Sequence, residues 1–493
     1  MGTVLGIDLG TQALKVLIYD PEGKSTKAVE SASLDLYQSD CGAAEQQAQW
    51  WLKALQQALS NVPPKERRAV KAIAVSGQQH GFVALNSANE VIAPVKLWCD
   101  TSTQQQCDDI TRDFGGPEAV IDQLGNPILP GYTASKIRWL KDAKPEVYRH
   151  LDGILLPHDF LNLYLTGHRC MEMGDASGTG FFDISKRRWS ETMLSAIDPE
   201  RDLRAMLPEP KKDNEAIGQL TQVAAEELGL SAGIPVAIGG GDNMMGAIGT
   251  GNVTAGRLTL SLGTSGTVYG HCDQPVIDPK GSIAGFCSST GGWLPLLCTM
   301  NCTVTTELMR RLFSTDIEDF ERRISQAPLG SEGVITVPFF GGERTPNLPH
   351  GQGCILGLNS ANMQPNNLLR SAIEGATFAL KFGIDELAGL GVTGQQIVLT
   401  GGGANSPQWR QLVANIADSP VTVYHNNEGA AFGAAMQALQ VLTPGSDIAS
   451  IVDEHLVADL ARCCEPEPSA VGDYADHYQS YQRAVDAITT LYR

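Results

Sequence analysis

Short apolar runs separated by glycine-containing turns are the first pattern along the chain. Residues 4–9 and 15–19 are mostly apolar, and the turn Gly10-Thr11-Gln12 lies between them. Two such runs joined by a short polar turn predict a β-hairpin at the start of the chain.

The same pattern recurs in the middle of the chain. Residues 258–262 and 267–270 flank the turn Gly263-Thr264-Ser265, and Leu9-Gly10-Thr11 is identical to Leu262-Gly263-Thr264. A length of 493 residues also exceeds that of one ordinary domain. We therefore predict a duplicated α/β unit, with one domain over residues 1–248 and a second over residues 249–493.

Each half also contains a strand-like run that ends in three glycines before a helix-like segment. Residues 235–238 lead to Gly239-Gly240-Gly241, and residues 397–400 lead to Gly401-Gly402-Gly403. A strand, glycines and a helix start bring bare backbone N–H groups and a helix dipole up to a phosphate. These two segments are therefore predicted to approach a phosphorylated ligand.

Elsewhere, apolar residues recur every three to four positions. This spacing predicts amphipathic helices over residues 46–59 and 368–387. Beyond about residue 443 the chain is polar and helical in pattern, and it contains no chemical motif.

The composition is that of a globular protein, with 42% hydrophobic and 18% charged residues. The formal net charge is −19, from 55 acidic and 36 basic residues. Because nucleic acids are held by clustered Lys and Arg, we expect no nucleic-acid partner. A phosphorylated small molecule stays compatible with this charge, since a few N–H groups and one metal ion can hold it locally.

The eleven cysteines are scattered and include no CxxC pair. We interpret them as reduced packing thiols, not as a disulfide framework or a zinc site. No run approaches the roughly 20 apolar residues of a membrane span, and the N-terminus does not resemble a signal peptide. We expect a cytoplasmic protein without a membrane partner.

Two aspartates lie at positions where a carboxylate indicates a functional role. Asp8 ends the first apolar run, and it reads either as a ligand for magnesium on ATP or as an acid that caps local amides. The adjacent Gly-Thr turn favours the magnesium ligand. Asp242 follows three glycines, and it reads either as a base that accepts a hydroxyl proton or as a helix N-cap. Taken alone, the Gly-Gly-Gly-Asp string favours the cap.

Polar side chains follow a further strand-like run at residues 72–75. The segment Gln78-Gln79-His80-Gly81 is typical of hydrogen-bonding groups for a polyol, although a lone His is usually structural. Trp98-Cys99-Asp100 follows another apolar run and is predicted to add a pocket wall and an acceptor. Phosphate-binding loops of the GxxxxGK[ST] type and GxGxxG motifs after the first strand are absent from the sequence.

Together these strings resemble the FGGY family of carbohydrate kinases and, within it, the kinases that act on D-xylulose. The resemblance covers nearly the whole chain in order. It is carried by Gly6-Ile7-Asp8-Leu9-Gly10-Thr11, Gly77-Gln78-Gln79-His80-Gly81, Leu97-Trp98-Cys99-Asp100, Gly239-Gly240-Gly241-Asp242-Asn243, Leu262-Gly263-Thr264-Ser265, Gly342-Glu343-Arg344-Thr345-Pro346 and Gly401-Gly402-Gly403-Ala404.

The resemblance implies two duplicated ribonuclease-H-like domains, as in actin and hexokinase, with an active-site cleft between the domains. It implies phosphorylation of a ketose, D-xylulose first, with ATP and Mg²⁺ as cofactors. By similarity Asp242 is the general base, and Asp8 lies by the magnesium. The remaining site residues that it implies are Gln79, His80, Trp98 and Asn243 for the sugar, Thr11, Gly263 and Thr264 for the phosphates, and Gly402, Gly403 and Ala404 for the adenosine.

Some positions depart from the pattern of these kinases. Gln79 stands where Met is usual, Thr101-Ser102 stands where Gly-Arg often follows, and His158 replaces the usual Lys. These departures leave ribulose, gluconate or another polyol open as the substrate. An actin-like ATPase without sugar kinase activity and an inactive sugar sensor are further alternatives. The sequence does not determine the oligomeric state, and a homodimer is among the expectations.

Overall fold

The computed structural model describes residues 2–211, 216–426 and 428–492, which form two compact units. Unit 1 comprises Met1–Val253, Cys272–Leu294 and Glu428–Leu456, and unit 2 comprises Thr254–His271, Pro295–Asn427 and Val457–Arg493. The predicted division after residue 248 placed residues 428–456 with the second half. In the structure this late segment instead packs with unit 1.

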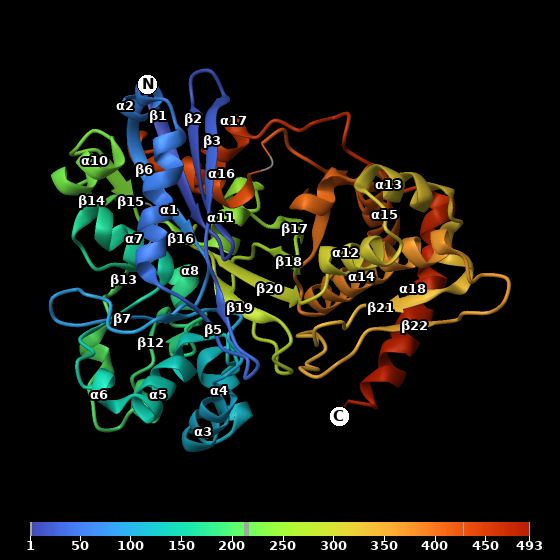
Figure 1. Ribbon diagram of the computed structural model, residues 1–493, viewed down its shortest axis with the longest axis horizontal. Helices are drawn as coiled ribbons and strands as arrows, with labels where there is room; N and C mark the ends of the chain where they lie inside the picture. The colour runs from blue at the N-terminus through green and yellow to red at the C-terminus, as the bar shows by residue number, and fades with distance from the viewer. Residues whose placement is uncertain (1, 212–215, 427, 493) are drawn as a thin grey trace. The chain divides into compact units, whose positions relative to one another are not determined.

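The sheet of unit 1 has the strand order β14-β15-β6-β1-β2-β3, with β16 also paired to β6 (Figure 1). Its strands are β1 (Thr3–Leu9), β2 (Ala13–Asp20), β3 (Ser25–Ser33), β6 (Val70–Gly77), β14 (Ala216–Gln219), β15 (Pro235–Ala237) and β16 (Gly240–Gly241). The predicted first hairpin is confirmed, because β1 and β2 pair in antiparallel fashion. β6 and β1 are parallel, so their carboxyl ends meet at one edge of the sheet.

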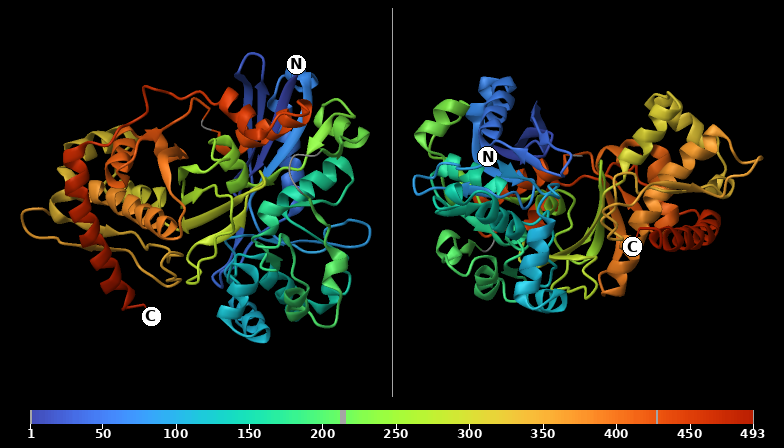
Figure 2. Two further views of the ribbon diagram at one scale, coloured as in Figure 1. Left: turned by 180° about the vertical axis from the view of Figure 1, so that it is seen from behind. Right: turned by 60° about the horizontal axis from the view of Figure 1, so that its bottom comes forward.

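Helices cover both faces of this sheet. Successive side chains of a strand point to opposite faces, and on β1 the buried Leu5 and Ile7 belong to the same hydrophobic core as Trp51 of α1 (Ala48–Asn61). Gly6 faces the other side, where a Cβ would lie 2.0 Å from the carbonyl oxygen of Ala431 in α16. Figures 1 and 2 show α1 and α16 on these opposite faces.

α16 is the element that brings the late segment into unit 1. It packs on β1 and β6 and crosses α11 at very short range. A Cβ at Gly249 would lie 1.8 Å from the carbonyl oxygen of Gly429, and one at Gly433 would lie 1.8 Å from that of Met245. The two helices therefore pack backbone against backbone, which only glycine permits at these positions.

Helices form much of unit 1 outside its sheet. The predicted helix over residues 46–59 begins two residues later than expected, because Gln46 belongs to the short strand β5 (Ala44–Gln46). Besides α1, the helices are α2 (Pro64–Ala69), α3 (Gln104–Phe114), α4 (Pro117–Leu124), α5 (Thr133–Ala143), α6 (Pro145–Tyr148), α7 (Pro157–Thr166), α8 (Met173–Ala176), α9 (Glu191–Ile197), α10 (Gln222–Leu228), α11 (Asp242–Gly249), α16 (Gly429–Leu442) and α17 (Ile448–His455).

Unit 2 repeats the central strand pattern of unit 1. Its strands run in the order β20-β18-β17-β23-β24, with β17 and β18 antiparallel and β17 and β23 parallel. Their bounds are β17 (Gly256–Leu262), β18 (Gly266–Gly270), β20 (Trp293–Thr299), β23 (Gly394–Thr400) and β24 (Val421–Thr422). The second predicted hairpin and the internal duplication of a hairpin beside a parallel strand are both confirmed.

The predicted helix over residues 368–387 is α14, and the polar C-terminal segment ends in α18. The helices of unit 2 are α12 (Thr303–Leu312), α13 (Ile317–Gln326), α14 (Pro365–Gly389), α15 (Pro407–Ala417) and α18 (Pro468–Thr489). Over the described ranges, no helix combines the length and the apolar character that crossing a membrane requires.

Candidate functional site

Most of the predicted site residues of unit 1 lie at one edge of its sheet. In the parallel registers Asp8 of β1 is opposite Ser76 of β6, and Gly241 of β16 is opposite Gly77. Gln79 and His80 follow β6 directly, and Asp242 follows β16 directly. The carboxyl ends of parallel strands are where α/β proteins commonly bind ligands.

Asp8 is a half-buried carboxylate at the end of β1. Ser76 Oγ donates a hydrogen bond to its Oδ1 at 2.8 Å. Burial raises the pKa of Asp8 above its ordinary value, and the Ser76 hydroxyl and the charge of Lys15 only partly offset this. A carboxylate in such a place gains from a cation beside it.

Asp242 occupies the first turn of α11, but it is not the N-cap. Gly241 holds that position, and no side chain caps this helix end. Asp242 Oδ1 accepts hydrogen bonds from the backbone N–H of Asn243 at 2.8 Å and from Asn243 Nδ2 at 3.1 Å. The helix-cap interpretation is therefore wrong.

Three causes raise the pKa of Asp242 to about 7. Burial is the largest, and the negative charges of Asp8 and then Asp175 add to it. A carboxyl group with this pKa can hold or release a proton near neutral pH, which suits a general base.

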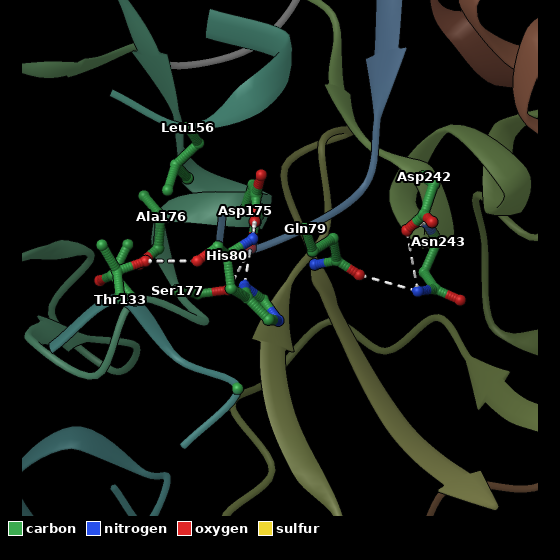
Figure 3. A network of polar contacts seen from close by, with 12 residues as sticks. Gln79, His80, Thr133, Leu156, Asp175, Ala176, Ser177, Asp242 and Asn243 are labelled. Atoms are coloured by element: carbon green, nitrogen blue, oxygen red, sulfur yellow. Dashed lines mark hydrogen bonds and ion pairs between the residues drawn. The ribbon is translucent and has the colours of Figure 1, made fainter. Parts of the chain in front are cut away.

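Gln79 and Asn243 connect the end of β6 to the start of α11. Asn243 Nδ2 donates to Gln79 Oε1 at 2.8 Å, as Figure 3 shows beside Asp242. Gly241 leaves room for this pair, since a Cβ there would lie 2.7 Å from Gln79 Cγ. Three of the predicted residues are thus brought into one hydrogen-bonded group.

The backbone of His80 has a left-handed conformation that a non-glycine residue seldom adopts, with φ of 62°. Its N–H donates to Asp175 Oδ1 at 3.0 Å. Its carbonyl oxygen accepts from Lys136 Nζ at 2.8 Å and from Thr133 Oγ1 at 3.1 Å. Buried side chains from two other segments therefore hold both polar groups of this peptide (Figure 3).

The imidazole ring of His80 is also closely surrounded. Its Nδ1 lies 3.0 Å from Asp175 Oδ1, and its centroid lies 5.0 Å from the Tyr132 ring and 5.4 Å from the Phe286 ring. A Cβ at Gly178 would lie 1.9 Å from His80 Cε1. The ring is therefore fixed in one place before any ligand binds.

A buried group of charges behind His80 was not predicted from the sequence. Asp175 lies between His80 and His158, and His158 lies between Asp175 and Asp159; all four side chains are buried. Burial opposes the charge on Asp175, but contacts with His158 and His80 outweigh it and lower the pKa of Asp175 to about 2. The signals available in the sequence were His158 in place of the usual Lys and the acids at residues 172 and 175 in a glycine-containing stretch.

Lys136 is a second buried cation that sequence reasoning did not single out. It is fully buried, and its Nζ donates to the carbonyl oxygens of His80 and of Gly131, the latter at 2.6 Å. Burial lowers the pKa of Lys136 to about 7.

Thr11 and Trp98 contact each other at the turn between β1 and β2. Trp98 Nε1 donates to Thr11 Oγ1 at 3.0 Å, and Thr11 Oγ1 donates to Gln78 Oε1 at 3.0 Å. Gln78 Nε2 in turn donates to Gln46 Oε1 at 2.9 Å. The Thr11 hydroxyl therefore joins the predicted phosphate turn to the predicted sugar residues.

The expectation that Asp100 offers an acceptor to a ligand is wrong. Asp100 is fully buried, and protein donors occupy both of its carboxylate oxygens. Oδ2 accepts from the Ala44 N–H and from Lys96 Nζ, both at 2.9 Å, and Oδ1 accepts from the backbone and the hydroxyl of Ser102. Asp100 thus holds the Trp98 loop in place.

Unit 2 carries the other predicted residues, at its own strand ends. Gly263 and Thr264 form the turn between β17 and β18, and Gly402, Gly403 and Ala404 form the short helix η3 (Gly402–Asn405) after β23. Gly402 is exposed, and a Cβ there would meet nothing within 4 Å. The N-cap Ser406 of α15 accepts from the Trp409 N–H at 3.0 Å. The predicted strand, glycines and helix start are confirmed here.

Among the described residues there is no group of three or more His, Cys, Asp or Glu side chains that could hold a metal ion. A site in which Mg²⁺ contacts one or two carboxylates and keeps its waters and substrate oxygens does not need such a group.

The duplicated sheets, the glycine turns and the Asp242 carboxylate fit a phosphotransferase, and the matching family models give the class, the carbohydrate kinases. The model of the FGGY family of carbohydrate kinases, N-terminal domain, matches residues 3–249, and the model of the C-terminal domain matches residues 258–441. The chain belongs to the FGGY family of carbohydrate kinases.

Relatives and solved structures extend this result. The chain is 40% identical over 484 residues to a protein named xylulose kinase from Haemophilus influenzae, covering 97% of this chain and 98% of that one. A ligand-bound xylulose kinase from Lactobacillus acidophilus matches with a TM-score of 0.92 and 25% identity over 100% of this chain and 99% of that one. These similarities confirm the predicted two-domain kinase fold.

A gluconate kinase from Lactobacillus acidophilus also matches, with a TM-score of 0.91 and 24% identity over 99% of both chains. At that identity the likeness shows the fold alone. Since kinases named for different sugars share this fold, the fold does not select the substrate.

Proposed function

We propose that this chain transfers the γ-phosphoryl group of ATP to D-xylulose, with Asp242 as the general base. The observation that carries the proposal is the Asp242 carboxylate, which begins α11 at the carboxyl end of the sheet and is linked through Asn243 to Gln79. Burial raises its pKa to about 7, which suits proton acceptance. The names of the relatives support the sugar, because proteins called xylulose kinase match nearly the whole chain.

The groups around Asp242 would bind and orient the sugar. Asn243 Nδ2 donates hydrogen bonds to Gln79 Oε1 and to Asp242 Oδ1, and His80 follows Gln79 along the chain. Amide and imidazole groups can each donate to and accept from sugar hydroxyls. The indole N–H of Trp98 donates to Thr11 Oγ1, and the ring of Trp98 would supply an apolar wall of the sugar site.

Asp8 would hold the magnesium ion of Mg-ATP, directly or through a water molecule. Its carboxylate fits this role because burial disfavours its charge and because Asp242 repels it, so a cation there relieves both. When bound, Mg²⁺ would neutralise charge on the phosphoryl oxygens. The protein's own part is to keep Asp8 in place through the Ser76 hydroxyl.

The glycine turns would bind the nucleotide. Thr11, Gly263 and Thr264 would line the phosphates, because turns of this type present backbone N–H groups. Gly402, Gly403 and Ala404 would lie against the adenosine, and the open surface at Gly402 supports a close approach. We also propose a reducing, cytoplasmic setting, since the eleven cysteines are free thiols.

A coupled assay for ADP release tests the function. D-xylulose, D-ribulose, gluconate and a reaction without sugar would be compared at saturating Mg-ATP. We expect the highest kcat/KM with D-xylulose and little ADP without sugar. A higher value with another polyol would reassign the substrate, and equal ADP release without sugar would point to an ATPase instead.

A further inference from the structure

A line of four buried side chains ends at His80. His158 Nε2 lies 2.9 Å from Asp159 Oδ1, His158 Nδ1 lies 3.3 Å from Asp175 Oδ2, and Asp175 Oδ1 lies 3.0 Å from His80 Nδ1. The two contacts of His158 lack the angles of hydrogen bonds, so they are attractions between charges. His158 has no exposed surface, which excludes direct contact with the sugar.

The position of His158 is set by the local fold. It lies in the first turn of α7, beside Asp159, whose Oδ2 accepts from the Leu156 N–H at 3.1 Å. Gly77 allows this helix to approach β6 closely, since a Cβ there would lie 2.9 Å from His158 Cβ. The imidazole therefore reaches the region directly behind the end of β6.

The surroundings of Asp175 are rich in acids. Asp159 is linked to it through His158, and the charges of Glu172 and Asp242 also act on this group. Glu172 accepts from the N–H groups of Gly174 and Asp175 and from Ser289 Oγ at 2.9 Å. Buried carboxylates in such numbers need a cation among them to remain charged.

Two basic side chains are near this acidic group, and they contact different atoms. The ammonium of Lys136 lies on the carbonyl oxygen of His80, whereas His158 contacts the Asp175 carboxylate. Burial opposes a charge on His158, but Asp159 and Asp175 outweigh it and raise the pKa of His158 well above its ordinary value. The imidazolium form therefore balances Asp175 and Asp159 together.

The dependence of His80 on Asp175 is geometric. A left-handed histidine persists only where its surroundings hold it. Asp175 Oδ1 accepts a hydrogen bond from the backbone N–H of His80, and it lies 3.0 Å from His80 Nδ1 without hydrogen-bond geometry. An Asp175 side chain that turned away would lose both contacts. The peptide of His80 would then keep only the bonds to its carbonyl oxygen, and its ring only the packing around it, which orient His80 less strictly.

We propose that His158 is a positioning residue for sugar binding, which acts through Asp175 to hold His80 in its left-handed conformation. This inference rests on the proposed function, in which His80 contacts the sugar. Similar kinases usually have Lys at this position. The inference therefore assigns to this position a task that any cationic side chain of suitable length can perform.

The test is a double-mutant cycle on D-xylulose binding. His158→Gln removes the charge, His158→Lys keeps it, His80→Ala removes the proposed sugar contact, and His80→Ala/His158→Gln combines the two losses. For each variant, KM for D-xylulose, KM for ATP and kcat are measured together with the thermal unfolding midpoint.

We expect His158→Gln to raise KM for D-xylulose by about tenfold, because Asp175 loses the attraction of a buried cation and holds His80 less firmly. Its kcat and its KM for ATP should change much less, and His158→Lys should restore KM to within about threefold of the parent value. Because His158 acts through His80, the double variant should have the same sugar KM as His80→Ala alone.

Two controls separate a positioning effect from a loss of stability. His455 is buried, and its Nδ1 lies 3.0 Å from the Tyr19 hydroxyl in the same unit. His455→Gln should lower the unfolding midpoint and leave the sugar KM unchanged. If His158→Gln does not fold, His158→Gln/Asp159→Asn removes one charge of each sign, leaves Asp175 without its cation and should raise the sugar KM in the same way.

The outcomes distinguish this inference from the function on which it rests. A sugar KM that His80→Ala leaves unchanged would remove His80 from the proposed sugar site. If His80→Ala raises the KM but His158→Gln does not, or if the double variant adds the two effects, His158 does not act through His80. Failure of His158→Lys to restore binding would also overturn the role of charge.

Discussion

Asp242 carries its carboxylate where burial and two neighbouring acids oppose ionisation. A carboxyl group whose folded pKa is raised binds a proton more tightly in the native than in the unfolded state. Such a group makes the native state less stable as pH rises from about 4 to about 7, because the unfolded state releases the proton first. This lower stability is the signature of a group kept for chemistry, not for folding.

Replacing Asp242 with Asn separates chemistry from stability. We expect kcat to fall by about 10²- to 10⁴-fold, the usual contribution of a positioned base. The thermal unfolding midpoint above pH 7 should stay equal or rise, since a destabilising buried charge is removed. Single-turnover rates at saturating sugar and melting curves measure the two quantities.

Asp198 is a matched control for this substitution. It is buried in the same unit, and its carboxylate accepts from Lys141 Nζ and from the Tyr148 hydroxyl, both at 2.6 Å. Burial opposes its charge, but these contacts outweigh it and lower the pKa of Asp198. Asp198→Asn should lower the unfolding midpoint and leave kcat unchanged. Near-normal turnover in Asp242→Asn would exclude Asp242 as the base.

The pH dependence of the reaction should report the same group. Because the pKa of Asp242 is about 7 in the free protein, its ionised fraction falls about tenfold per pH unit well below 7. We expect kcat/KM for D-xylulose to fall in parallel between pH 7 and pH 5. Glu172 and Lys136 also have pKa values of about 7. The residual activity of Asp242→Asn should therefore lack this inflection, and an unchanged inflection would assign it to another group.

Among the elements, the crossing of α11 and α16 is the most demanding contact in unit 1. It joins α11, which begins with Asp242, to α16, which comprises residues 429–442. Glycines at both sides of the crossing let the two backbones touch. The position of the proposed base thus depends on a helix from the far end of the sequence.

Substituting alanine at Gly433 tests this crossing. Its Cβ would lie 1.8 Å from the carbonyl oxygen of Met245, which forces the backbones apart. We expect a loss of about 1–3 kcal/mol in the free energy of unfolding, as for other overpacked sites. Gly472 provides the control, because it lies in α18, is exposed and has no atom within 4 Å of an added Cβ. Gly472→Ala should stabilise by roughly 0.5–1 kcal/mol through helix propensity, and equal effects at both sites would contradict the packing account.

At the scale of the whole molecule, the proposed sugar and nucleotide groups are distributed over two units. Gln79, His80, Asn243 and Asp242 belong to unit 1, and the glycines of η3 belong to unit 2. The net charge is −19, so buried basic side chains in this molecule are informative. Among them, Lys136 and His158 are buried in unit 1 behind the proposed sugar residues.

Hydrogen exchange with single ligands tests this division. D-xylulose alone should slow amide exchange at residues 78–80 and 242–244 of unit 1, because bound ligand suppresses local opening. A non-hydrolysable ATP analogue alone should slow exchange at residues 263–265 and 402–405 of unit 2. Protection by D-xylulose at residues 402–405 without protection at residues 78–80 would reverse the assignment.

Several features follow from the sequence because their causes are local. Alternating apolar runs and Gly-Thr turns specify the hairpins at β1–β2 and β17–β18, and helical spacing specifies α14. The strings around Asp8, Gln79 and Asp242 were singled out because polar groups at the ends of buried strands are uncommon. Turn chemistry and side-chain periodicity act between near neighbours, so a single sequence is enough to read them.

Only the tertiary structure decided which of these groups lie close to one another in space. Asp175 is 95 residues from His80 in the sequence, and Gly239 accepts and donates hydrogen bonds with Gln437 across 198 residues. The buried line from Asp159 to His80, the internal role of Asp100 and the return of α16 to unit 1 depend on such distant pairs. Burial and charge set a pKa through neighbours in space, and the chain order does not contain that information.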